Sequence, residues 1–215
     1  HPPEVRGVKK FRVSESSYVK ETAEANKKYL KANVDYHAGK ISPKEYGYAI
    51  EDFKCAEDRM KKEQIDFAKA VHGRIWEKQS ETTKQAIQSY SGDEYYAKLN
   101  SDLRRGKESS ATVHIDKLLQ SAKLPKNMHV YRGIYDLKLF GKNPSAMVGK
   151  VISDKAFIST SESESVARDF IDFERGALLQ IRLPKGSNGF IMNADNPKIS
   201  KELEVLLPRN MKGLI

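Results

Sequence analysis

The sequence predicts an α+β fold in which N-terminal helices pack on a mostly antiparallel β core. Two observations support this prediction. Apolar residues recur at helical spacing through the first half of the chain, whereas after Pro125 short apolar runs alternate with Gly, Pro, Asn and Ser. Helices followed by a strand-rich half are typical of α+β proteins, and 215 residues are enough to bury a core of normal size.

The helical segments differ in how clearly their ends are marked. Residues 14–33 have helical spacing but few apolar positions, and Gly39 breaks the pattern. Residues 42–45 combine an N-cap serine, a proline in the first turn and a capping-box glutamate, so a second helix is expected to begin there. Its apolar stripe continues to Val71, and Gly73 is expected to end it. Three further helices are expected to begin at Ser80, at Asp93 and near His114.

The strand-like segments after Pro125 are short and are flanked by turn residues. They cover residues 128–131, 150–152, 156–158, 178–183, 189–192 and 204–207. One or two helical turns are expected within residues 164–173. Short strands separated by turn residues favour antiparallel pairing over a parallel sheet.

The composition argues against several classes of protein. The formal net charge is +9, but the lysines are scattered among glutamates along the helical segments, which indicates solvated helix faces rather than a nucleic-acid groove. No apolar run is long enough for a transmembrane helix, and no group of Cys, His and carboxylate residues has metal-ligand spacing. We therefore expect neither a nucleic-acid partner, nor a membrane span, nor a bound metal.

The single cysteine and the first residues bear on how the protein is made. Cys55 stands alone, which excludes an intramolecular disulfide, and we expect it to be a small apolar residue on a helix without a catalytic role. The chain begins with His1, Pro2 and Pro3 rather than Met, and no apolar signal segment follows. We interpret it as an excised or processed piece of a longer product whose targeting segment is missing.

Two pieces of the strand-rich half place reactive residue types at strand ends. Arg132 ends an apolar strand directly before Gly133. Ser159, Thr160 and Ser161 end a second apolar strand with three hydroxyl groups. Taken alone, an arginine at a strand end is usually a surface residue, and three hydroxyl residues usually form a turn.

A third piece places two carboxylates close together. Glu202 and Glu204 are two positions apart in an apolar stretch. A strand has a period of two residues, so both carboxylates are expected on one face of a strand while Leu203 and Val205 enter the core. Like charges on one face repel each other, and such an arrangement favours a functional site over an ordinary exposed strand.

Together the three pieces resemble the Arg, Ser-Thr-Ser, Glu-x-Glu signature of the bacterial-toxin class of mono-ADP-ribosyltransferases, which includes actin-modifying binary toxins and Rho-modifying exoenzymes. The resemblance extends to Trp76 and to residues 86–92, 95–100, 103–104, 124–128 and 181–186. It covers about residues 74–215 and implies that family's catalytic core, with helices packed on two sheets. Residues 1–73 then form a helical N-terminal region without an assigned role.

The resemblance implies that the chain uses NAD as a substrate and transfers ADP-ribose to an arginine of another protein. Arg132 would bind the NAD phosphates or ribose, because a guanidinium offers several fixed donors. The main chain of Gly133 would lie close to the nicotinamide amide. Ser159 would hydrogen-bond the nicotinamide ribose and orient the catalytic glutamate, and Thr160 and Ser161 would support this geometry.

The same resemblance divides the work between the two glutamates. Glu204 would be the catalytic residue, since cleavage of the nicotinamide–ribose bond develops positive charge that a carboxylate stabilises. Glu202 would orient the acceptor guanidinium and remove a proton from it during attack. In the family, Glu at this position is typical of arginine-specific enzymes, whereas Gln is typical of the asparagine-specific Rho modifiers.

Aromatic residues complete the expected NAD site. The resemblance adds Tyr90 and Tyr96 from the helical half. It also implies an aromatic residue and an arginine in the loop after the three hydroxyl residues, for which Phe173 and Arg175 are the candidates and Phe170 is the alternative aromatic. The spacing departs from the usual Phe-x-x-Arg pattern of the family.

The target protein stays open at this point. The loop expected to recognise the acceptor, residues 193–201, has no aromatic residue, in contrast to many relatives. Actin or another arginine-bearing host protein would serve as the target of a secreted or delivered toxin or effector, and a delivery component or other domains of a longer chain would be further partners. Two alternatives remain, namely an NAD glycohydrolase and a non-catalytic helical binding module with a degenerate transferase fold.

Overall fold

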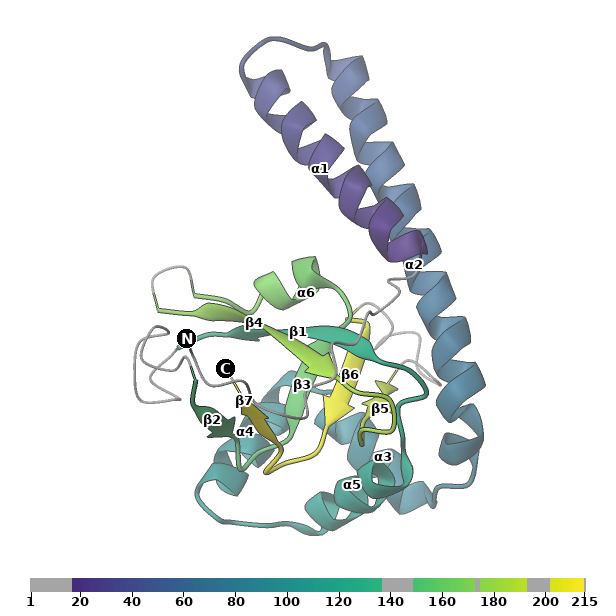
Figure 1. Ribbon diagram of the computed structural model, residues 1–215, viewed down its shortest axis with the longest axis vertical. Coiled ribbons are helices and arrows are strands. Elements are labelled where there is room, and N and C mark those ends of the chain that lie inside the picture. The colour runs from purple at the N-terminus through teal and green to yellow at the C-terminus, as the bar shows by residue number, and fades with distance from the viewer. Residues whose placement is uncertain (1–16, 137–148, 173–174, 193–201, 215) are drawn as a thin grey trace, which may run out of the picture.

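The structure is a computed structural model that describes residues 17–136, 149–172, 175–192 and 202–214 (Figure 1). Its helices are α1 (Ser17–His37), α2 (Pro43–Glu77), α3 (Glu81–Tyr90), α4 (Asp93–Arg104), α5 (Ser110–Ser121) and α6 (Glu164–Arg168). Its strands are β1 (Met128–Ile134), β2 (Val151–Ser153), β3 (Ile158–Ser161), β4 (Ala177–Leu183), β5 (Phe190–Ile191), β6 (Glu204–Leu207) and β7 (Lys212–Leu214). The predicted α+β fold is confirmed.

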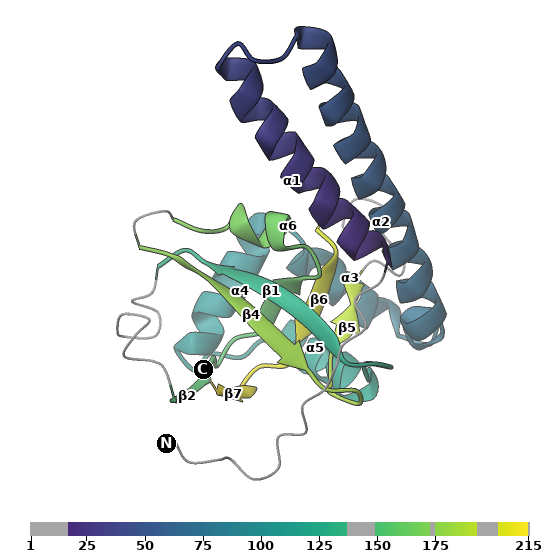
Figure 2. The same cartoon turned by 45° about the horizontal axis from the view of Figure 1, so that its top comes forward.

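The strands form two antiparallel sheets. The larger sheet has the order β4-β1-β3-β6-β5, and β2 pairs with β7 in the smaller one. Helices α3, α4 and α5 lie on one side of the larger sheet, whereas α6 packs over β1 on the other side (Figures 1 and 2). The core lies between this helical layer and the central strands, with Ile115, Leu118, Val205 and Leu206 almost fully buried. All four residues of β6 are buried, and β6 pairs with β3 along its whole length, so these two strands, which carry most of the expected site, are fixed together.

Helices α1 and α2 form an antiparallel hairpin whose far end extends away from the sheets (Figure 2). The predicted start of α2 is confirmed, because Ser42 and Glu45 form a capping box in which each side chain accepts a hydrogen bond from the other's backbone N–H. The two helices are held together by stacked rings of Tyr29, Tyr46 and Phe53. The hairpin therefore has its own small, half-buried aromatic cluster.

The prediction that Gly73 ends the second helix is wrong. Helix α2 continues to Glu77, and the residues on either side of Gly73 that face the core, His72 and Trp76, are both buried. A glycine inside a helix costs only about 1 kcal/mol relative to alanine, whereas burying a large side chain such as Trp76 stabilises the fold by more than that. The expected boundary after residue 73 thus falls inside a helix.

Smaller differences concern the ends of elements. Asp93 is the first residue of α4 rather than its cap, which is Gly92. Strand β3 begins at Ile158, two residues later than expected, and the short strand β7 was not expected at all. Cys55 lies on a helix, as predicted, but on its exposed side. None of the helices within the described residues combines the length and the apolar character that crossing a membrane requires.

Candidate active site

A cleft of about 620 Å³ opens where α3 and α4 meet β1, β3, α6 and β6. Its volume falls in the range of about 300–1,000 Å³ that is usual for sites of small molecules and cofactors. The cleft brings together expected residues that lie up to 114 positions apart in the chain, since Tyr90 and Glu204 both line it. Its expected lining residues are Tyr90, Tyr96, Arg132, Gly133, Ser159, Thr160, Ser161, Phe170, Glu202 and Glu204.

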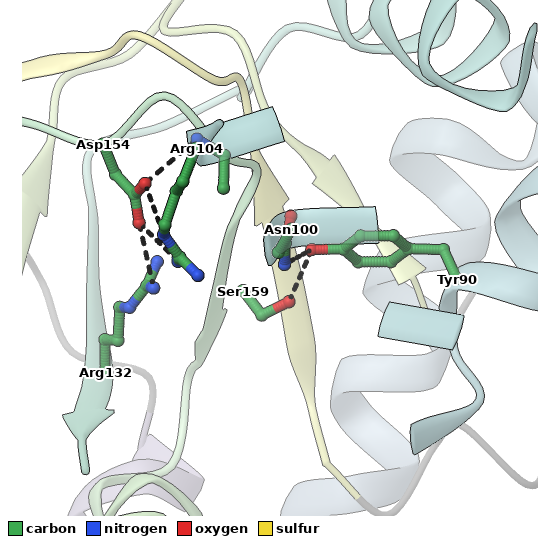
Figure 3. Close-up of polar contacts among 7 residues, drawn as sticks. Tyr90, Asn100, Arg104, Arg132, Asp154 and Ser159 are labelled. Atoms are coloured by element: carbon green, nitrogen blue, oxygen red, sulfur yellow. Dashed lines mark hydrogen bonds and ion pairs between the residues drawn. The ribbon is translucent and has the colours of Figure 1, made fainter. Parts of the chain in front are cut away.

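A chain of hydrogen bonds ends at Glu204. Figure 3 shows its first part, in which the Asn100 side-chain amide donates to the Tyr90 hydroxyl oxygen at 3.0 Å and the Tyr90 hydroxyl lies 3.3 Å from Ser159 Oγ. Ser159 in turn hydrogen-bonds the Glu204 carboxylate, as its place diagonal to Glu204 in the β3–β6 pair allows. Because a carboxylate can only accept, the Ser159 hydroxyl donates to Glu204 and accepts from Tyr90.

Burial controls the charge of Glu204. Loss of solvent raises the pKa of Glu204 to about 7, the hydrogen bond from Ser159 opposes this rise, and the negative charge of Glu202 adds to it. Burial and the nearby Glu204 charge also raise the pKa of Tyr90, which stays a neutral donor. A carboxylate with a pKa near neutrality in a cleft is a physical indication of a catalytic group.

The prediction that Glu202 and Glu204 share one face of a strand is wrong for Glu202. Strand β6 begins at Glu204, and Glu202 lies exposed in the preceding turn. The chain turns because Leu203 adopts the left-handed conformation, with φ of 50°, while its side chain is buried as expected. Both carboxylates still line the same cleft, Glu204 in its buried part and Glu202 at its exposed edge.

Thr160 and Ser161 support this arrangement from the neighbouring strand. The Thr160 hydroxyl donates to the Val205 carbonyl at 2.6 Å, and the Ser161 hydroxyl donates to the Glu202 carbonyl at 2.6 Å. The hydroxyl residues therefore hold the backbone on both sides of Glu204.

The buried Arg132 meets two charged residues for which we predicted no role. Asp154 accepts two hydrogen bonds from Arg104, at 3.0 and 2.8 Å, and one from Arg132 at 3.4 Å (Figure 3). Although burial alone would raise the pKa of Asp154, the bonds from Arg104 and from the Ala156 backbone hold it below its usual value. Asp154 is thus an anion that holds two guanidinium groups, and both arginines line the cleft.

Gly133 is required by a close approach of the backbone. A Cβ atom at this position would lie 2.1 Å from the carbonyl oxygen of Ala167 and 2.9 Å from Cβ of Phe170. The small residue therefore lets α6 and the nearby Phe170 close over β1. Phe170, the alternative aromatic residue of our prediction, lines the cleft with 54% of its surface exposed.

Other residues expected in the site either lie outside the described residues or do not line the cleft. Phe173 and the expected acceptor loop at residues 193–201 lie outside the described residues. Arg175 is not among the residues that line the cleft, and its side chain pairs with Asp172 at 2.9 Å and lies over the ring of Tyr135.

Comparisons with known proteins show which family the chain belongs to. The profile of the family described as ADP-ribosyltransferase exoenzyme matches residues 59–215, more than half of the chain. A search with this chain found no matching curated protein sequence. Similar solved structures are Plx2a, an ADP-ribosyltransferase toxin from Paenibacillus larvae, with 24% identity over 71% of this chain and 84% of that one and a TM-score of 0.58, and an ADP-ribosyltransferase from Clostridium botulinum, with 23% identity over 68% and 84% and a TM-score of 0.52.

A third similar structure is BECa, an ADP-ribosylating toxin of a binary enterotoxin of C. perfringens, solved with NADH. It is 19% identical over 70% of this chain and 41% of its own, with a TM-score of 0.57. Identities this low establish a common fold and leave function to the site. With the family profile covering the whole strand-rich half and the helices that line the cleft, the chain belongs to the ADP-ribosyltransferase exoenzyme family.

Proposed function

We propose that the chain cleaves NAD and transfers its ADP-ribose unit to an arginine side chain of a target protein. The observation that carries this proposal is the pair of carboxylates in one cleft, in which Glu204 is buried and hydrogen-bonded by Ser159 while Glu202 stands at the exposed edge. Two carboxylates in such different surroundings are suited to different tasks.

The donor groups of the cleft suit the NAD diphosphate. Arg104 and Arg132 both line the cleft, and their guanidinium groups offer planar sets of donors that match phosphate oxygens. Asp154 holds the two groups side by side, so their orientation is set before NAD binds. Two positive charges against one negative charge leave the cluster with a net charge that favours an anionic ligand.

Glu204 would act on the bond between ribose and nicotinamide. When this bond breaks, its electron pair leaves with nicotinamide, which becomes neutral, and positive charge develops on the ribose. A carboxylate that accepts a hydrogen bond from the ribose 2′-hydroxyl stabilises this charge most strongly in the transition state. Ser159 would keep the carboxylate directed at the ribose.

Glu202 would act on the acceptor. A guanidinium is protonated in water and is a poor nucleophile. As a nitrogen of the acceptor forms its bond to the ribose carbon, a carboxylate beside it can take the proton that the nitrogen loses. The exposed position of Glu202 would let a protein side chain reach it.

Substitutions at the two glutamates test this division. Glu204→Gln is expected to lower both NAD hydrolysis and transfer by about 100-fold or more, because the stabilised charge develops whichever acceptor follows. Glu202→Gln is expected to lose transfer to arginine while keeping most of the hydrolysis, since water needs no help from Glu202. Released nicotinamide and labelled acceptor are measured in the same reaction. Equal loss of both activities in Glu202→Gln would contradict the assignment.

The same site could serve an NAD glycohydrolase, in which water takes the place of the arginine. Incubation of the unaltered chain with labelled NAD and a cell lysate distinguishes the two functions. Labelled protein together with free nicotinamide supports transfer. Free nicotinamide without labelled protein supports hydrolysis alone. If transfer is observed, the labelled band identifies the target, for which we propose a protein of a host cell that a secreted or delivered toxin would reach.

A further inference from the structure

Helix α2 touches the segment that directly follows the three hydroxyl residues of β3. The side-chain amide of Gln64, which is 5% exposed, donates a hydrogen bond of 3.1 Å to a carboxyl oxygen of Glu162. Glu162 follows Ser161, the last residue of β3. The contact joins residues 98 positions apart, and neither Gln64 nor Glu162 lines the cleft.

The backbone next to this contact holds the turn that carries Glu202. The Glu162 backbone N–H donates to the Leu203 carbonyl at 3.1 Å, and the Ser161 hydroxyl donates to the Glu202 carbonyl at 2.6 Å. Leu203 lies in the left-handed region, which is unfavourable for a residue with a side chain. Because the turn is unfavourable by itself, these two bonds from the neighbouring segment help to hold its shape.

The Gln64 side chain also contains an unused acceptor. Its Oε1 is buried and has no hydrogen-bond partner among the described residues, although Nε2 is bonded to Glu162. A buried acceptor left without a donor destabilises the fold. A neutral Glu162 carboxyl has an O–H that could donate to Oε1, and an acid and an amide would then exchange two hydrogen bonds.

The surroundings of Glu162 favour its neutral form. Burial raises the pKa of Glu162 to about 7, against the opposing effects of Lys126 and of the bond from Gln64, and the nearby Glu63 raises it further. These are the groups that face Glu162 from α2 and from the segment before β1. Near neutral pH the carboxyl therefore changes between a form that can only accept and a form that can also donate.

We propose that Gln64 and Glu162 are a positioning pair through which α2 holds the turn of Glu202 and Leu203 in the shape that acceptor attack requires. The inference rests on the proposed function. It concerns the acceptor step more than the cleavage of NAD, because Glu204 is fixed independently by the β3–β6 ladder, whereas Glu202 lies in the turn. The pair acts through the backbone and does not touch the reacting atoms.

The test compares four variants of the full chain, with NAD and a small guanidine such as agmatine as the acceptor. Gln64→Ala and Glu162→Ala are expected to lower the ratio of transfer to NAD hydrolysis by about 10-fold, as a small displacement of a positioned group does. Glu162→Gln should keep the ratio within about 2-fold, because an amide there can accept from Gln64 and donate to it. Glu164→Ala, an exposed glutamate two residues away, is the matched control and should leave the ratio unchanged.

The pH dependence gives a second measurement, which avoids truncated side chains. The ratio of transfer to hydrolysis in the unaltered chain should fall as the pH rises through about 7 and Glu162 loses its proton. In Glu162→Gln the ratio should depend less on pH. A ratio with the same pH dependence in both chains would overturn the proposal, and so would an unchanged ratio in folded Gln64→Ala and Glu162→Ala.

A failure of the proposed function can be distinguished from a failure of this inference by the activity of the unaltered chain. An unaltered chain that releases no nicotinamide and labels no acceptor would remove the enzymatic assignment. The link to α2 is then measured without activity, by hydrogen exchange of the Glu162 amide that donates to Leu203. Faster exchange in Gln64→Ala than in the unaltered chain supports the link, and equal exchange overturns it.

Discussion

Glu204 stands in conflict with its surroundings. In the proposed mechanism it carries a negative charge that stabilises a developing cation, yet its burial opposes that charge, and the neighbouring Glu202 opposes it further. The Ser159 hydrogen bond is the compensating contact. Such a balance places the pKa near neutral pH, where a carboxylate can be charged and still be a reactive base.

The first prediction concerns the direction in which NAD hydrolysis changes with pH. In the proposed mechanism the charged form of Glu204 is the active one, so kcat/KM for NAD hydrolysis should be lost as the pH falls through about 7. Glu202→Gln removes a like charge and should shift this midpoint to lower pH. Hydrolysis is measured between about pH 5 and pH 9, with the exposed Glu164→Gln as the control. A midpoint that stays in place in Glu202→Gln would show that the two carboxylates do not interact.

The second prediction concerns Asp154 and the two arginines. Asp154→Asn leaves the buried Arg132 without its anion, and breaking a buried ion pair costs about 3–5 kcal/mol. Since the Arg104 side chain is 30% exposed, we expect the lower end of that range in the free energy of unfolding. Bound NAD would bring an anion back, so NAD should raise the melting temperature more in the variant than in the unaltered chain. Equal shifts would show that the arginines do not meet the diphosphate.

At the scale of elements, α2 is attached to the sheet by a buried histidine. His72 Nδ1 accepts from the Ile191 backbone N–H at 3.1 Å, so Nε2 carries the proton and donates to the Lys123 carbonyl at 3.2 Å. Burial lowers the pKa of His72, against the opposing bond to Lys123. The neutral ring also stacks on Phe190 of β5. Helix, strand and connecting segment thus share one side chain whose contacts require the neutral form.

The third prediction follows from this tautomer. The folded pKa of His72 lies below its unfolded value of 6.5, so the contribution to stability is complete above 6.5 and is lost as the pH falls toward the folded pKa. His72→Gln should therefore weaken the dependence of the urea midpoint on pH between about pH 7.5 and pH 5.5. Matched measurements on His37→Gln, a histidine at the end of α1, provide the control. Identical slopes in the unaltered chain and in His72→Gln would contradict the proposed role.

Predictions from sequence succeeded where the signal was local. The caps at Ser42 and Ser80 depend on residues within one helical turn, and both helices begin where expected. They failed where distant contacts decide. Gly73 does not end its helix because the sheet buries the next turn, and nothing near Asp154 in the sequence indicates Arg104, which lies 50 residues earlier.

In the site, too, predictions from local sequence order were correct, whereas those that depend on distant contacts were not. Its hydroxyl and carboxylate residues were identified by their order along the chain, and the cleft brings most of them together. The predicted position of Glu202 on the strand was wrong, because the left-handed Leu203 interrupts the strand pattern and its backbone is held by contacts from β3 and the residue after it.

At the scale of the whole molecule, α2 belongs to two parts of the protein. Its first half packs on α1, where Thr22 donates to the Ala56 carbonyl and Glu21 pairs with Arg59. Its second half enters the catalytic core, where Ala68 and Trp76 are buried. The family match begins at residue 59, close to the change between these two environments. The functional division of the chain is therefore expected near residue 59 rather than at residue 73.

The last prediction compares two fragments. A fragment of residues 59–215 retains Gln64, Ala68 and His72 with their contacts to the core, so it should fold and retain NAD hydrolysis. A fragment that begins at Gly73 lacks all three, and native stability of about 5–15 kcal/mol leaves little margin for such a loss.

Circular dichroism and nicotinamide release are measured on both fragments and on the full chain. We expect the shorter fragment to be unfolded, or to melt well below the longer one. A folded and active fragment from Gly73 would show that the part of α2 before Gly73 contributes nothing to the site. A folded but inactive fragment of residues 59–215 would show instead that α1 and the first part of α2 take part in NAD cleavage, although they lie outside the part of the chain that the family match covers.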